Sequence, residues 1–249
     1  MSNPAELQSL LKALKLSGIL DHLDVRLMEA QNNELSFSEL LAMILTDEME
    51  ARRNRKLQRL IKRAHLDPGK TLESFDFSFN PSTNAVHIRE LARCQFIERA
   101  ENVFLLGPTG TGKTHLAQAL SHMACRGHLV VDFYSFHELF ATLTRADLAG
   151  RLDRQIASLI KSDLLVIDDF AFKKMDQKTA EWLYAIVDGR YALRSIILTS
   201  NRALSDWTGI FPDKVMANAV MDRLAHNAHQ IVIKGESFRK KKSPQHKGA

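Results

Sequence analysis

The sequence predicts an α/β fold, in which helices cover both faces of a mostly parallel sheet, preceded by a small all-α N-terminal domain. Three observations support this prediction. The apolar residues of the first third of the chain show only helical spacing. From about residue 100, short apolar runs alternate with helical segments, and a glycine-rich loop joins the first run to the next helix.

The size and composition of the chain are typical of a soluble globular protein. Its 249 residues allow one large domain or two modest ones, and 45% of them are apolar and 25% charged. Two cysteines, Cys94 and Cys125, exclude a disulfide framework and indicate buried thiols in a reducing compartment. No apolar run reaches the roughly 18 residues of a membrane span, and no signal peptide is apparent. We therefore expect a cytoplasmic protein without a membrane partner.

The N-terminal part, residues 1–66, is expected to form a helical domain. Gly18 is expected to end a first helix, and a second helix follows it directly. Ser36 and Glu39 form a capping box ahead of a third helix, which can run about 30 residues because no glycine or proline occurs before Pro68. The apolar residues of the three helices are Leu7, Leu10, Leu11 and Leu14; Ile19, Leu20, Leu23 and Leu27; and Phe37, Leu40, Leu41, Ile44 and Leu45.

Positive charge is concentrated in two places. The net charge is +5, and the stretch from Lys234 onward, with six lysines and arginines and one glutamate, carries the same excess. The second half of the third helix carries a cluster whose spacing places several charges on one face, where they could follow a phosphate backbone. These residues are Arg52, Arg53, Arg55, Lys56, Arg59, Lys62 and Arg63. The patches indicate a polyanionic partner, nucleic acid, bound without base-specific reading, or else a solvated helix face and a disordered tail over residues 239–249.

A proline and a glycine interrupt the third helix and begin a linker over residues 67–81. Phe75, Phe77 and Phe79 alternate within it, which would place three aromatic rings on one side of an extended segment. Such rings most often pack in a core. A second use is contact with the adenine of a bound nucleotide, and the pattern leaves both open.

Residues 82–238 are expected to form the α/β domain. Five short apolar runs, rich in β-branched residues, predict its strands at residues 103–106, 129–134, 164–167, 196–199 and 230–234. Helical segments separate these runs. One ends near Arg126, another begins at a capping box formed by Ser135 and Glu138, and a third runs from Thr179 to Arg190.

The loop after the first predicted strand matches the phosphate-binding pattern GxxxxGK[ST] in full. Its residues are Gly107, Pro108, Thr109, Gly110, Thr111, Gly112, Lys113 and Thr114. The loop lies between a predicted strand and a predicted helix, which is the context that the motif requires. Glycines let backbone N–H groups converge on phosphate oxygens, and the helix N-terminus adds positive potential. Lys113 is expected to contact the β- and γ-phosphates of ATP, and the Thr114 hydroxyl is expected to ligate Mg²⁺.

Two acids follow the third predicted strand, at the edge where open α/β sheets bind ligands. Asp168 is expected to hold the Mg²⁺, and Asp169 to orient or deprotonate the attacking water. The alternative is that the two carboxylates only cap the next helix. Together with the glycine-rich loop, the pair favours an ATP hydrolase over a small kinase, which needs an acceptor pocket.

These motifs resemble those of AAA+ ATPases of the DnaC and IstB branch, over residues 75–239. The resemblance implies a P-loop AAA+ sheet and three further site residues. Asn201 matches the sensor-1 position, and Arg223 matches the arginine finger that reaches the ATP of a neighbouring subunit. Arg239 ends a stretch similar to the branch's C-terminal motif and would contact phosphate. Because little chain follows Arg239, the C-terminal lid is expected to be reduced or absent.

Within this branch, the N-terminal helices and the residues after Thr114 look more like IstB than like a DnaC-type loader. The resemblance implies an ATP hydrolase that assembles head-to-tail on double-stranded DNA and recruits or stimulates an IstA-like transposase. One alternative is a DnaC-type loader of the replicative helicase. Another is a structural module in which ATP binding drives assembly and hydrolysis only returns the subunits to their starting state. One departure concerns hydrolysis: the catalytic acid is usually glutamate, and Asp169 is one methylene shorter.

Overall fold

The computed structural model describes residues 4–80 and 83–238. Contacts within the chain divide it into two compact units, Met1–Arg59 and Leu60–Ala249. The division falls within the third helix, so residues 67–80 belong to the larger unit. It differs from the sequence-based boundaries at residues 66 and 81, which stay predictions about separately folding domains.

The smaller unit is helical, as predicted, and contains α1 (Pro4–Ala13), α2 (Ser17–Asn32) and most of α3 (Phe37–Arg63). The prediction that Gly18 ends the first helix is wrong, because this residue lies in the first turn of α2. Glycine is needed there for close packing: a Cβ would lie 2.6 Å from the Cβ of Ala51 in α3. The Glu48 carboxylate accepts the N–H groups of Gly18 and Ile19 at 2.7 and 3.3 Å, which satisfies the start of α2.

The apolar faces predicted for these helices are buried only in part. Leu11 and Ile19 are buried, whereas Phe37 is 93% exposed. The capping box at the start of α3 is confirmed, since Ser36 N–H donates to Glu39 at 2.8 Å and the Ser36 hydroxyl accepts the Glu39 N–H at 3.4 Å. Large apolar side chains that stay exposed here include Leu7, Leu10, Leu14, Leu27, Leu41 and Leu45.

The larger unit is built on a five-stranded parallel sheet in the order β2-β3-β4-β1-β5. The strands are β1 (Asn102–Leu106), β2 (Val131–Ser135), β3 (Leu164–Asp168), β4 (Ser195–Ser200) and β5 (Ala228–Val232). All five were predicted, with small shifts in their bounds. Strands β1, β3 and β4 are buried throughout, which explains why they read as continuous apolar runs.

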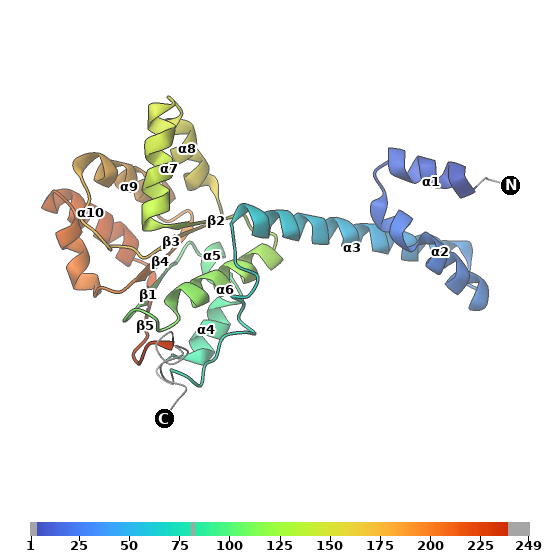
Figure 1. Ribbon diagram of the computed structural model, residues 1–249, viewed down its shortest axis with the longest axis horizontal. Coiled ribbons are helices and arrows are strands. Elements are labelled where there is room, and N and C mark those ends of the chain that lie inside the picture. Colours follow the sequence, from blue (N-terminus) through green and yellow to red (C-terminus); the bar gives the residue numbers. More distant parts are fainter. Residues whose placement is uncertain (1–3, 81–82, 239–249) are drawn as a thin grey trace, which may run out of the picture. The chain divides into compact units, whose positions relative to one another are not determined.

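Helices cover both faces of this sheet (Figure 1). They are α4 (Ala85–Leu91), α5 (Gln95–Glu98), α6 (Lys113–Arg126), α7 (Phe136–Leu148), α8 (Leu152–Lys161), α9 (Gln177–Arg190) and α10 (Lys214–Ala225), with a 3₁₀ helix at Leu204–Ile210. Helix α6 lies on one face with α4 and α5, and α7 to α10 lie on the other. The predicted capping box at Ser135 is confirmed at the start of α7. The sequence did not predict α4, α5, α8, α10 or the 3₁₀ helix.

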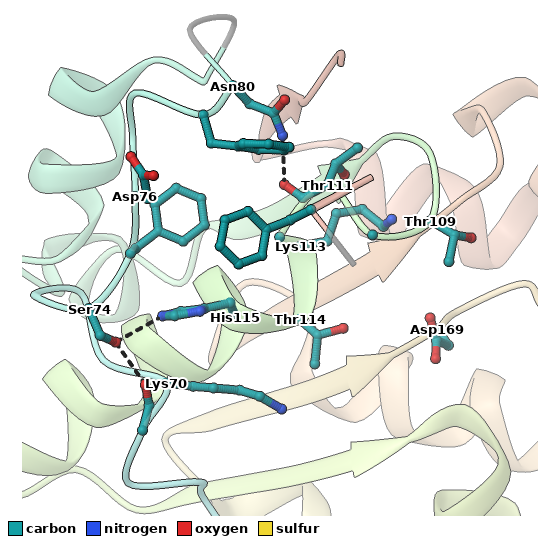
Figure 2. Close-up of a pocket in the computed structure, with 16 residues that line it drawn as sticks. Lys70, Ser74, Asp76, Asn80, Thr109, Thr111, Lys113, Thr114, His115 and Asp169 are labelled. Atoms are coloured by element: carbon teal, nitrogen blue, oxygen red, sulfur yellow. Dashed lines mark hydrogen bonds between the residues drawn. The ribbon is translucent and has the colours of Figure 1, made fainter. Parts of the chain in front are cut away.

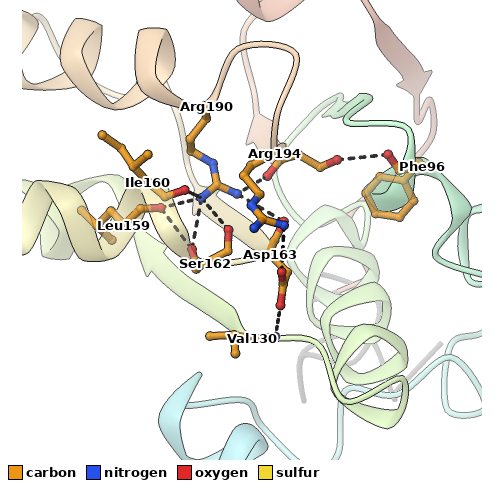
Figure 3. A network of polar contacts seen from close by, with 9 residues as sticks. Phe96, Val130, Leu159, Ile160, Ser162, Asp163, Arg190 and Arg194 are labelled. Carbon is orange, nitrogen blue, oxygen red and sulfur yellow. Dashed lines mark hydrogen bonds and ion pairs between the residues drawn. The ribbon is translucent and has the colours of Figure 1, made fainter.

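A fully buried arginine at the end of α9 joins this helix to α8 and to the start of the central strand β4 (Figure 3). The Arg190 guanidinium donates to the backbone carbonyls of Leu159 and Ser162 at the end of α8, and to that of Ser195 at the start of β4. Burial lowers the pKa of Arg190 to about 10, so the side chain is still charged at neutral pH. Backbone carbonyls thus replace the hydration that this cation loses on folding.

Candidate nucleotide-binding site

The glycine-rich loop joins β1 to α6 at the carboxyl edge of the sheet. Gly107, Gly110 and Gly112 all have positive φ angles, of 147°, 85° and 99°. At Gly107 a Cβ would lie 2.1 Å from the carbonyl oxygen of Ile233, so neighbouring backbone excludes any side chain. Lys113 begins α6, is only 6% exposed and donates from Nζ to the Pro108 carbonyl at 2.7 Å.

The loop forms one wall of a cavity of about 460 Å³, which is large enough for a nucleotide (Figure 2). Predicted site residues from Thr109 to Thr114 line it, together with Asp169. Gly107 and Pro108 do not line the cavity; they shape the loop. The other lining residues are Gly69, Lys70, Ser74, Phe75, Asp76, Phe79, Asn80, His115 and Phe238.

The two predicted acids lie at the end of β3 and adopt different conformations. Asp168 accepts a hydrogen bond from the Thr114 hydroxyl at 3.0 Å, and Asp169 has a positive φ of 55°. Thr199 of β4 bridges the pair, because its hydroxyl donates to Asp168 and accepts the Asp169 N–H at 2.9 Å. Asp168 is therefore bound to the phosphate-binding loop through Thr114, and both acids at the end of β3 are bound to Thr199 of the neighbouring strand β4.

Burial raises the pKa of Asp168 above its ordinary value; the Thr199 hydrogen bond opposes this rise, and the charge of Asp169 adds to it. A divalent cation beside this carboxylate would favour its ionised form. The Thr114 hydroxyl and the Asp168 carboxylate are the oxygen ligands that Mg²⁺ prefers. Within residues 4–80 and 83–238, no three His, Cys, Asp or Glu side chains form a metal site by themselves. This donor set fits a Mg²⁺ that is held jointly with nucleotide phosphates.

Asn201 and Arg223 do not line the cavity, and neither does Asp168, which reaches it only through its hydrogen bond with Thr114. Asn201 follows β4 and is exposed. Arg223 lies on α10, where its Nε donates to Asp188 at 2.8 Å and its guanidinium carbon lies 5.3 Å from the Tyr184 ring centroid. Arg223 does not line the cavity of its own chain. The prediction for Arg239 falls outside the described residues.

Comparison with known proteins assigns the chain to a family. The model of the IstB-like ATP-binding proteins matches residues 9–246. The chain belongs to this family. It is 42% identical over 237 residues to the insertion sequence IS21 ATP-binding protein of Pseudomonas aeruginosa, a match that covers 95% of this chain and 89% of that protein. It is also 38% identical over 210 residues to the IS5376 ATP-binding protein of Geobacillus stearothermophilus, covering 84% of each chain.

Solved structures with the same fold are P-loop AAA+ proteins. The AMPPCP-bound DnaA of Aquifex aeolicus superposes with a TM-score of 0.59 and 24% identity, over 70% of this chain and 53% of that one. A DnaC helicase loader superposes with a TM-score of 0.53 and 22% identity, over 60% of this chain and 88% of that one. This IstB-like chain therefore has the AAA+ fold. In the part that the structure describes, no C-terminal helical lid is evident.

The end of the described chain packs on the phosphate loop of this IstB-like protein. Phe238 donates its N–H to the Gly110 carbonyl at 2.9 Å, and its ring lies 4.9 Å from that of Phe79. A Cβ on Gly110 would lie 2.1 Å from the Ser237 hydroxyl, so this approach also requires glycine. Residues close to the C-terminus thus form part of the cavity wall.

The sequence left two roles open for the three phenylalanines of the linker, core packing or contact with a nucleotide. In the structure these rings occupy different environments. Phe75 and Phe79 line the cavity, whereas Phe77 packs edge-on against Phe75 and lies beneath Arg89. The predicted arrangement on one side of an extended strand is wrong, because residues 67–80 form turns. No sequence motif indicates that residues 67–80 line the cavity.

The basic residues of α3 are all exposed, but several have acidic partners. Arg52 and Arg55 both bind the Glu48 carboxylate, at 2.7 and 3.1 Å. Arg63 lies 3.3 Å from Asp132. The positive potential of this face is therefore lower than the number of its basic residues indicates. None of the helices within the described ranges is both long and apolar enough to cross a membrane.

Proposed function

We propose that this protein is a cytoplasmic ATP hydrolase that assembles on duplex target DNA and recruits or stimulates a partner transposase of the IstA type. The observation that carries the proposal is a cavity lined by Thr109 to Thr114 of the phosphate-binding loop and by Asp169, with Asp168 hydrogen-bonded to the Thr114 hydroxyl at its base. The relatives that match over 84–89% of their length are named as insertion-sequence proteins, which favours transposition over helicase loading.

The phosphate-binding loop and the two acids have separate chemical tasks in this proposal. Backbone N–H groups of the loop and the Lys113 ammonium bind the β- and γ-phosphates of ATP. Thr114 and Asp168 would hold Mg²⁺, which would supply positive charge to offset that of the phosphates. Asp169 accepts a proton from the water that attacks the γ-phosphate, with its backbone fixed by Thr199.

Assembly is the second part of the proposal. Arg223 lies outside its own cavity, which is what an arginine that acts on a neighbouring subunit requires. Asn201 is exposed at the carboxyl edge of the sheet and is proposed to respond to the γ-phosphate. An interface of this kind is head-to-tail and repeats to give a ring or a helix of subunits.

DNA contact is proposed for the exposed basic face of α3. Phosphates would attract these side chains irrespective of base sequence, which suits an assembly that spreads along a duplex. The residues are Arg52, Arg53, Arg55, Lys56, Arg59, Lys62 and Arg63. Since Glu48 binds Arg52 and Arg55, and Asp132 binds Arg63, the other four carry the greater share of the proposed affinity.

Two substitutions test the enzymatic part of this function. Lys113→Ala removes the cation of the loop, and we expect loss of ATP binding by calorimetry. Asp169→Asn removes the proton acceptor and should retain ATP while steady-state hydrolysis falls by about 100-fold or more. Asp153→Asn, an equivalent change on the exposed face of α8, is the control and should hydrolyse ATP like the wild type. Wild-type hydrolysis by Asp169→Asn would remove this residue from the mechanism.

A further inference from the structure

Four polar side chains on one face of α6 hold the segment of residues 67–74. They recur at helical spacing and are His115, Gln118, His122 and Arg126. Gln118 accepts the backbone N–H of Asp67 at 2.9 Å, and the His122 ring donates to the Asp67 carbonyl at 2.9 Å. This pair fixes both backbone groups of Asp67 against the middle of the helix.

The two ends of the same face hold the rest of the segment. In the first turn of α6, the His115 ring donates to the Thr71 carbonyl at 2.8 Å. The same ring nitrogen lies 3.2 Å from the Ser74 hydroxyl (Figure 2). Arg126, at the end of α6, binds Glu73 at 2.7 Å. Hydrogen bonding to Arg126 lowers the pKa of Glu73 to about 2, so this ion pair is present at neutral pH. The segment is thus attached along the helix that begins in the phosphate-binding loop.

A tight turn at the start of this segment sets the position of Lys70. Asp67 and Pro68 occupy the first two positions of a β-turn, which are the positions that these residue types favour. The Lys70 N–H donates to the Asp67 carbonyl at 3.0 Å, and the Gly69 N–H donates to the Asp67 carboxylate at 2.9 Å. Because α6 holds Asp67, the backbone of Lys70 is fixed relative to the loop.

The side chain of Lys70 extends from this turn into the cavity, on the side of Thr114 (Figure 2). It is 37% exposed, and its Nζ lies 3.6 Å from the Asp67 carboxylate, which is a long and partly solvated ion pair. Among the lining residues, Lys70 and Lys113 are the two lysines, and Asp76 and Asp169 are the two acids. A nucleoside triphosphate brings about four negative charges, which one lysine and one divalent cation offset only in part.

We propose that Lys70 is a second phosphate-binding lysine of this cavity, positioned by the polar face of α6. The inference rests on the proposed function, in that ATP is the ligand of the cavity. When the Lys70 ammonium leaves the half-exposed Asp67 carboxylate and binds a phosphate oxygen, it gains a stronger, charge-assisted hydrogen bond. Lys70 then links ATP binding to the segment of residues 67–74, which α6 holds.

Calorimetric titration of the full-length protein with ATP, ADP and adenosine, in the presence of Mg²⁺, tests this proposal. Lys70→Ala should weaken ATP and ADP by about tenfold, because a charge-assisted hydrogen bond to phosphate is lost. Adenosine, measured as a competitor, should bind both proteins equally, and Lys70→Arg should restore most of the affinity. Lys161→Ala, at the exposed end of α8, is the matched control and should bind like the wild type.

The outcomes separate this inference from the function on which it rests. Equal ATP and ADP affinities for wild type and Lys70→Ala would overturn the inference alone, provided that Lys113→Ala abolishes binding. An equal loss of adenosine, ATP and ADP would also overturn it, since that pattern indicates damaged packing. If the wild type itself does not bind ATP, the proposed function fails first.

Hydrogen exchange gives a readout that is independent of affinity. At saturating ATP, the amides of residues 69–74 should exchange more slowly in the wild type, because the nucleotide then holds Lys70. In Lys70→Ala at saturating ATP, this added protection should be absent, while the amides of the phosphate-binding loop stay protected. The same protection of residues 69–74 in both proteins would overturn the proposal.

Discussion

Thr199 connects the two acids of the cavity through a single hydroxyl group. This residue is fully buried at the end of β4, and its carbonyl also accepts the Phe170 N–H at 2.7 Å. Asp169 holds a left-handed backbone conformation, which costs energy for a residue other than glycine. The contacts from Thr199 stabilise that conformation, and they direct the Asp169 carboxylate to the cavity.

Thr199→Val should therefore affect hydrolysis more than ATP binding. Valine has the same shape but no hydroxyl, so Asp168 loses a donor and the Asp169 N–H loses an acceptor. We expect kcat for ATP hydrolysis to fall by about tenfold while the Kd for ATP changes by less than about threefold. Thr199→Ser keeps the hydroxyl and should retain most of the activity. Equal kcat values for the valine and serine variants would rule out this role for the hydroxyl.

At the residue scale, the sequence predicted what a short motif encodes. Lys113, Thr114 and Asp168 could be proposed from the sequence because their chemistry requires fixed spacing beside a strand, and the structure places the Thr114 hydroxyl 3.0 Å from the Asp168 carboxylate. Thr199 and Lys70 were not found, because their contacts depend on which strands are neighbours and on where a turn attaches to α6. No local pattern carries that information.

The buried contacts of Arg190 fix the positions of whole elements, α8, α9 and β4. Replacing Arg190 by methionine keeps much of the volume but leaves several buried carbonyls without a donor. We expect the free energy of unfolding to fall by about 3 kcal/mol or more, measured by urea denaturation. Arg194→Met is the control, because this arginine is half-exposed in an ion pair with Asp163, and it should cost less than about 1 kcal/mol. Equal effects of the two substitutions would contradict the account of this network.

The basic face of α3 leads to a second prediction at the scale of an element. Arg53, Lys56 and Lys62 have no ion-pair partner among the described residues, so their joint replacement by alanine should weaken binding to duplexes of any sequence. Three lost phosphate contacts should also reduce the salt dependence of log K by about three. Affinity is measured by fluorescence anisotropy at several salt concentrations.

The control for this prediction has the same change in charge elsewhere. Arg151, Arg154 and Lys161 lie in or beside α8, and their joint replacement by alanine should leave DNA affinity almost unchanged. If instead the α8 triple variant loses affinity and the α3 triple variant does not, the DNA site lies on the ATPase surface. An unchanged affinity in both variants would exclude α3 as the main DNA contact.

At the element scale, the strands that are most deeply buried were predicted best from the sequence. Strands β1, β3 and β4 were predicted because fully buried strands form uninterrupted apolar runs. Helix α8 was missed because only a short turn at Gly150, with a φ of 65°, separates it from α7. Gly18 was misassigned because a glycine that ends a helix and a glycine that lets two helices approach look the same in a sequence.

The whole molecule combines a unit with the AAA+ fold and a small helical unit whose apolar residues are partly exposed. Arg223 is held by Asp188 and Tyr184 on the surface formed by α9 and α10, outside its own cavity. The proposed cycle therefore depends on a second subunit, whose ATP would bind Arg223. ATP should promote assembly, and hydrolysis should loosen it.

Mass photometry of the full-length protein on duplex DNA tests this central claim most directly. With ATP, or with a non-hydrolysable analogue, the wild type should form complexes of many subunits, whereas ADP should support only small ones. Arg223→Ala should bind ATP normally, because this residue lies outside the cavity, but should form only small complexes on DNA. The account is contradicted if the wild type assembles equally with ATP, with ADP and without nucleotide, or if Arg223→Ala assembles like the wild type.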